Sequence, residues 1–194
     1  MRRTLRRKES IMPIIAPEPS KKLSKLCAFL IVVGLLLAVF GYFGPFVKVP
    51  GGSFESGFSL KKLASNNETL IKEEGRSISG FGAMNFFAHA TFILGIVTIA
   101  WFVLLCVLFI DNPELIYLVI GGLTVLFTIL AFIMAFVVAK GMSGPVVLPD
   151  ESTMMVNYTI GYGPLFLLFG GLLFGGGTAG KAFATPKTVS LHQG

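Results

Sequence analysis

Cysteine and histidine are scarce in this chain of 194 residues, which contains two of each. Cys27 and Cys106 are far apart and no Cys-x-x-Cys motif occurs, so we expect neither a disulfide framework nor a dithiol redox site. His89 and His192 lie in a predicted membrane segment and in the C-terminal tail, so they cannot share a metal. We therefore expect no metal, no cofactor and no enzymatic activity.

Charged side chains are missing from four long stretches. Charged residues make up only 13% of the chain against 54% hydrophobic residues, and the mean hydropathy is +0.79. Each stretch exceeds the roughly 20 residues that cross about 30 Å of hydrocarbon, and in lipid the backbone must satisfy its own hydrogen bonds. The sequence predicts an all-α membrane protein, a bundle of four transmembrane helices with spans at about 26–47, 84–110, 115–139 and 158–180. No acidic or basic residue lies within a span, which argues against an ion-coupled transporter.

The basic residues are unevenly distributed. Eight of the sixteen Lys and Arg lie within residues 1–25, next to the first span, and such a bias marks the cytoplasmic side. We expect a cytoplasmic basic tail (1–25), a transmembrane domain (26–184) and a cytoplasmic tail (185–194). The loops 48–83 and 140–157 then lie outside. This predicts a multi-pass protein of the plasma membrane or a bacterial inner membrane, with both termini cytoplasmic, and the net charge of +6 does not indicate a nucleic-acid partner.

The outer loops contain turn and strand signals. Pro50-Gly-Gly between alternating apolar residues predicts a β-hairpin over about 46–60. Ser65-Asn-Asn-Glu68 has capping-box spacing and predicts a short helix over about 66–74. Two apolar runs around Pro149-Asp150 predict a second hairpin. The two hairpins are on the same side, where they could pair into one small sheet.

Small residues recur at four-residue spacing in three of the spans. This spacing places them on one helix face, where another backbone can approach closely. The predicted helix-packing residues are Gly34, Ala38, Ala131, Ala135, Ala139, Gly171, Gly175 and Ala179. The faces of the third and fourth spans match, and the sequence leaves open whether they pack on each other or on partners.

Asn85 and His89 are four residues apart and share a face of the second span. They form a possible polar site, with a neutral structural histidine or a proton relay as the alternatives. Two sequons, Asn67-Glu-Thr and Asn157-Tyr-Thr, fall in the predicted outer loops and are possible glycosylation sites.

The layout of tails, spans and loops resembles that of the claudin and peripheral-myelin-protein group of tetraspan proteins. That group's first outer loop carries a Trp followed by Gly-Leu-Trp and two cysteines. Residues 48–83 here contain neither Trp nor Cys, so junction-forming and pore-forming roles are not carried over.

These features favour a structural, assembly or accessory-subunit role. Such a protein would contact the lipid bilayer and pack against other membrane subunits, or against copies of itself, through its small-residue faces and outer loops. The alternative is a small oligomeric channel or carrier subunit, in which Thr124, Thr128 and His89 line a polar path.

Overall fold

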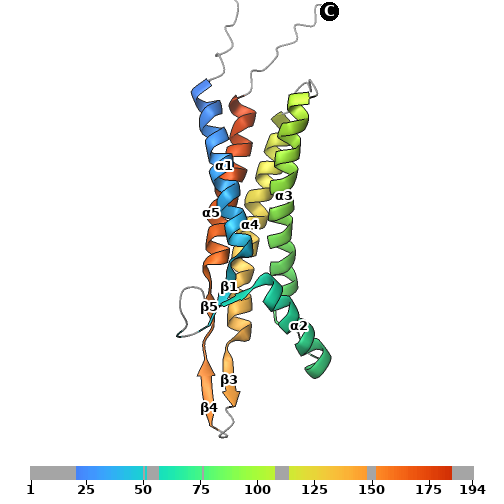
Figure 1. Ribbon diagram of the computed structural model, residues 1–194, viewed down its shortest axis with the longest axis vertical. Coiled ribbons are helices and arrows are strands. Elements are labelled where there is room, and N and C mark those ends of the chain that lie inside the picture. The colour runs from blue at the N-terminus through green and yellow to red at the C-terminus, as the bar shows by residue number, and fades with distance from the viewer. Residues whose placement is uncertain are drawn as a thin grey trace, which may run out of the picture.

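Four long helices and two small antiparallel sheets make up the computed structural model (Figure 1). It describes residues 21–49, 51, 57–75, 77–107, 114–147 and 152–184. The long helices are α1 (Lys21–Phe43), α3 (Phe81–Val107), α4 (Glu114–Met142) and α5 (Tyr162–Ala184), and each is long and apolar enough to cross a membrane. The predicted fold class is confirmed, and the chain is an integral membrane protein with four spans.

All four predicted spans differ from the helices at the end nearest the sheets. α3 begins at Phe81 instead of residue 84 and α4 ends at Met142 instead of residue 139, whereas α1 and α5 are shorter there than predicted. The prediction extended span one to residue 47, but α1 ends at Phe43 because Pro45 has no N–H to continue the ladder, and β1 (Pro45–Lys48) follows. The prediction began span four at residue 158, whereas α5 begins at Tyr162 because β5 (Thr159–Ile160) precedes it.

The opposite end of α1 differs as well. It begins at Lys21, within the predicted tail, since lysine and serine are compatible with a helical first turn. Residues 1–20 and the predicted C-terminal tail, 185–194, lie outside the described residues.

The three-stranded sheet has the order β2-β1-β5, with β2 at Gly57–Ser59. Val47 faces Phe58 on one side and Ile160 on the other, and the Gly161 N–H donates to the Phe46 carbonyl at 2.9 Å. The first predicted hairpin is therefore present. The second hairpin, β3 (Gly144–Val147) with β4 (Thr153–Val156), forms its own sheet, so only β5 joins the two loops.

The short helix between β2 and α3 is longer than predicted. α2 spans Leu60–Glu74 rather than 66–74, so the Ser65-Asn-Asn-Glu68 capping box lies inside the helix and the prediction of its start was wrong. Burial of Leu60 and Leu63 stabilises the first turn and outweighs the local capping signal. Gly75 ends the helix at φ 65°, a left-handed conformation in which glycine carries no Cβ penalty.

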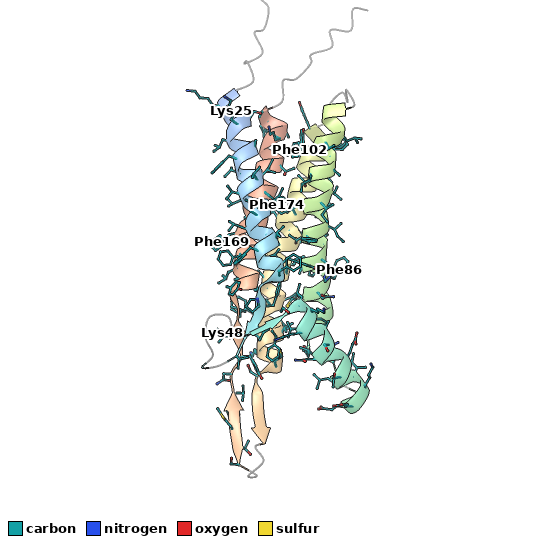
Figure 2. The ribbon with its side chains drawn as sticks, in the orientation of Figure 1. Lys25, Lys48, Phe86, Phe102, Phe169 and Phe174 are labelled. Atoms are coloured by element: carbon teal, nitrogen blue, oxygen red, sulfur yellow. The ribbon has the colours of Figure 1, made fainter. Side chains whose placement is uncertain are left out.

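In the bundle, α5 lies between α1 and α4, and α3 packs chiefly against α4 (Figure 1). Lys21 and Ala184, at the two ends of the helical domain, lie at the end of the bundle opposite the sheets. At the sheet end, Phe46, Val47, Leu63, Met84 and Val138 are fully buried, so one core joins the strands, α2 and the bundle. The interior Phe174 contrasts with Phe86 and Phe169, whose rings point outward on opposite sides (Figure 2).

Candidate functional site

The small residues of α1 face α5 at two points of backbone contact. A Cβ built on Gly34 would lie 2.7 Å from the Gly170 carbonyl oxygen, and one built on Gly170 would lie 2.7 Å from the Gly34 carbonyl oxygen. Gly41 and Gly163 show the same reciprocal relationship. A Cβ on Gly41 would lie 2.7 Å from the Gly163 carbonyl oxygen, and one on Gly163 would lie 2.9 Å from the Gly41 carbonyl oxygen. A side chain at any of these four positions would require α1 or α5 to move.

Ala38 belongs to the same interface, since a Cβ on Gly170 would collide with its backbone. At the far end, a Cβ on Gly177 would lie 3.0 Å from the Cys27 carbonyl oxygen. The α5 residues in this interface are therefore Gly163, Gly170 and Gly177, seven apart. The emphasis on four-residue spacing overlooked them, although Gly34 and Gly41 repeat at the same seven-residue interval.

The predicted face of α5 packs on α4. A Cβ on Gly171 would collide with Thr128 Oγ1, and one on Gly175 would lie 2.9 Å from the Gly121 carbonyl oxygen. Gly121 in turn is tight against Ala179, whose backbone nitrogen lies 2.7 Å from the built Cβ. Gly121 is a further position that the spacing argument missed.

The alanine stripe of α4 lies closer to the sheets. Ala131, Ala135 and Ala139 are almost completely buried, in the core cluster that also contains Met84 of α3 and Leu167 of α5. The α4 contacts of Gly171, Gly175 and Ala179 are instead with Gly121, Thr124, Val125 and Thr128. All eight predicted packing residues thus lie inside a single protomer.

The polar pair lies on α3 where it faces the end of α1. Nδ1 of His89 lies 2.7 Å from the Asn85 carbonyl oxygen. A carbonyl only accepts, so Nδ1 is the donor in this bond and Nε2 makes no bond to a described residue. The imidazole meets the Tyr42 ring edge-to-face, with centroids 5.3 Å apart, and Tyr42 stacks on Phe92 at 4.4 Å.

The buried threonines do not form the polar path of the channel alternative. Thr124 donates to the Ile120 carbonyl at 2.8 Å, and Thr128 donates to the Thr91 hydroxyl at 3.4 Å. Both are fully buried, whereas His89 is exposed at the edge of α3. Within the described ranges, nothing in this geometry favours a pore through one protomer.

Trp101 lies in α3, three residues after Thr98. Thr98 donates to the Leu94 carbonyl at 2.7 Å, and the buried indole Nε1 of Trp101 has no hydrogen-bond partner among the described residues. The described part of the chain also contains no group of three His, Cys, Asp or Glu side chains able to hold a metal ion.

The two sequons lie in different local structures. Asn67 lies within α2, where its Oδ1 accepts from the Ile78 N–H at 2.6 Å. The hydroxyl of Thr69, the third residue of that sequon, donates to the Ser65 carbonyl at 3.1 Å. Asn157 is exposed between β4 and β5. Only the second sequon has the exposed, non-helical setting that glycosylation favours.

Comparisons of this chain with protein-family models, with curated proteins and with solved structures find no match. The architecture is therefore interpreted from its own geometry.

Proposed function

We propose that this protein is a structural, assembly or accessory subunit that binds another membrane protein, or a second copy of itself, at its sheet end. The observation that carries the proposal is the β3–β4 hairpin, which extends beyond the bundle (Figure 1). On β4, Met154 and Met155 are 54% and 63% exposed. They lie beyond the spans and outside the predicted lipid region, so contact with acyl chains does not explain their exposure.

Exposed methionines on a projecting strand suit protein binding. Their unbranched thioether side chains adapt to irregular partner surfaces. The hairpin is a two-stranded sheet of its own, so each strand pairs with only one neighbour and offers a free edge for strand addition.

The small-residue faces are assigned a different role in this proposal. Because Gly34, Ala135, Gly171 and Gly175 are occupied by contacts within the protomer, we assign them to holding the bundle together. Partner binding is assigned to the β3–β4 hairpin, on which Met154 and Met155 are exposed. This role requires no catalysis.

The arrangement supports a likeness in organisation to the claudin and peripheral-myelin-protein group, with strands from both outer loops meeting in one sheet. We further propose that the sheet end is extracytoplasmic, with both termini in the cytoplasm of a plasma or bacterial inner membrane. The lysines at the start of α1, on the opposite end, support this orientation.

Purification of the tagged protein from native membranes in mild detergent tests the function. We expect an assembly larger than one protomer with one recurrent partner, identified by mass spectrometry, and we expect Met155→Lys to release that partner. Ile71→Lys is the matched control, since it places the same charge at a similarly exposed apolar site on α2. A wild-type protein that purifies only as a monomer, a partner that Met155→Lys does not release, or equal release by Met155→Lys and Ile71→Lys would contradict the proposal.

A further inference from the structure

Two cavities follow one another along the groove between α1 and α3. The first, about 470 Å³, is lined by Tyr42 and Phe43 of α1, by Asn85 and His89 of α3, and by the start of α2. The second, about 420 Å³, lies further along the same two helices, beyond the stacked Tyr42 and Phe92 rings, and its lining includes Val39 of α1. Both volumes fall within the range of roughly 300–1,000 Å³ found for small-molecule sites.

The groove exists because α1 and α3 each pack mainly on another helix. α1 is held by α5 and α3 by α4, so the two approach each other only locally. One approach is at Gly95, where a Cβ would meet Leu35 at 3.1 Å, and another is the stacked Tyr42–Phe92 pair. Phe174 of α5 contributes to the lining of the groove.

The first cavity gathers polar groups that have no partner among the described residues. Ser59 occupies the N-cap position of α2, yet its hydroxyl makes no capping bond. Lys61 forms no ion pair with any described residue and supplies the only charge in the lining. The amide of Asn85 and Nε2 of His89 are likewise free of bonds to described residues, since the bond within the pair uses Nδ1 and a backbone carbonyl.

These groups suit an anion. The first N–H groups of α2 lack intrahelical partners and carry the positive end of the helix dipole, beside the Lys61 ammonium. The Ser59 hydroxyl and the Asn85 amide add donors around the same volume, whereas Nε2 of His89 is an acceptor because Nδ1 carries the hydrogen. A phosphate group would satisfy several of these donors at once.

The second cavity has the opposite chemistry. Its lining is aliphatic and aromatic apart from the buried Thr91, whose hydroxyl already donates to the Phe87 carbonyl at 2.9 Å. It lies within the candidate spans, at hydrocarbon depth. An anion-binding cavity and an apolar cavity on the two sides of the Tyr42–Phe92 stack match the headgroup and one acyl chain of a single amphiphilic molecule that lies along the groove.

We infer that the α1–α3 groove is a specific binding site for an anionic glycerophospholipid. The phosphate group lies in the first cavity, against Lys61 and the start of α2, and one acyl chain occupies the second cavity along Ile96 and Ile99. The inference is independent of the partner-binding role.

Native mass spectrometry of the full chain, with added dioleoylphosphatidylglycerol or dioleoylphosphatidylcholine, tests the site. We expect one phosphatidylglycerol per protomer to bind more tightly than phosphatidylcholine. Lys61→Ala should weaken phosphatidylglycerol binding about fivefold, the effect of about 1 kcal/mol for one lysine near a charged surface. Lys62→Ala is the control, because Lys62 is also exposed and does not line the cavity.

A second pair of variants tests the acyl groove. Ile96→Trp fills the groove and should weaken binding of both lipids, whereas Ile93→Trp should not, although the two isoleucines are 54% and 55% exposed. Thermal unfolding verifies that each variant is folded. The inference would be overturned if Lys61→Ala and Lys62→Ala weakened lipid binding equally, or if Ile96→Trp and Ile93→Trp did so. It would also be overturned if the wild-type protein retained no lipid.

Discussion

Gly34 and Gly170 are in backbone contact, each placed so that a Cβ on one would lie 2.7 Å from the carbonyl oxygen of the other. This reciprocity leaves no room for a side chain at either position. Membrane helices associate through packing and not through exclusion of water, so lost backbone contact is not compensated elsewhere.

Gly170→Ala should destabilise the bundle by about 1–3 kcal/mol, the usual cost of overpacking. Gly176 lies on the same helix with nothing within 4 Å of a built Cβ, so Gly176→Ala should be neutral or stabilise by up to about 1 kcal/mol. Unfolding in mixed micelles with increasing dodecyl sulfate measures both. Equal effects would contradict the assigned contact.

Gly171→Ala should destabilise through its collision with the Thr128 side chain. Thr128→Ala removes the hydroxyl and the methyl group that obstruct the new Cβ, so the double variant should lose less stability than the sum of the two single ones. We expect a coupling of about 0.5–3 kcal/mol in the double-mutant cycle. Additive losses of stability would contradict the close contact between Gly171 and Thr128.

Asn67 should be a structural residue whether or not it is glycosylated. Asn67→Ala leaves the part-buried Ile78 N–H unpaired and should cost about 1–3 kcal/mol. Asn67→Asp keeps an acceptor while destroying the sequon, so its loss of stability should be smaller. Thermal unfolding compares the two, with Thr69→Ala, which abolishes the sequon and keeps Asn67, as the control. If Thr69→Ala and Asn67→Ala reduced the stability equally, the glycan, and not the hydrogen bond, would be what stabilises the protein.

The proposed orientation predicts which positions an impermeant thiol reagent can reach. In a chain with Cys27 and Cys106 changed to alanine, Thr153→Cys on exposed β4 should be labelled in intact cells. Lys22→Cys at the start of α1 should be labelled only after permeabilisation. The reversed pattern would place the sheet end in the cytoplasm.

Hydropathy predicted the four helices because a bilayer leaves the backbone few alternatives. Turn residues likewise predicted both hairpins. The start of α2 was missed because Ser65-Asn-Asn-Glu68 is a local signal, while burial of Leu60 and Leu63 depends on β1 and the bundle.

Helix pairing was the larger gap in the sequence analysis. Residue spacing shows that a helix face is lined by small side chains, but not which helix that face packs against. The match between the α4 and α5 stripes therefore did not reveal that α1 is the close partner of α5. The seven-residue repeat of Gly163, Gly170 and Gly177, set against Gly34 and Gly41, was the available signal. The α1–α3 groove lay beyond sequence reasoning, since it results from two helices packing elsewhere.

The pairing of β1 with β5 has a consequence for biosynthesis. Val47 and Lys48, synthesised just after α1, pair with Thr159 and Ile160, which emerge only when the last span is about to follow. Until then, β1 lacks its second strand partner, β5, and α1 lacks the α5 backbone against which Gly34 and Gly41 pack. A nascent chain must therefore hold its first helix without its main packing partner until its last helix is inserted. Release of a chain truncated before α5 would expose a glycine-lined helix face to the quality-control machinery of the cell.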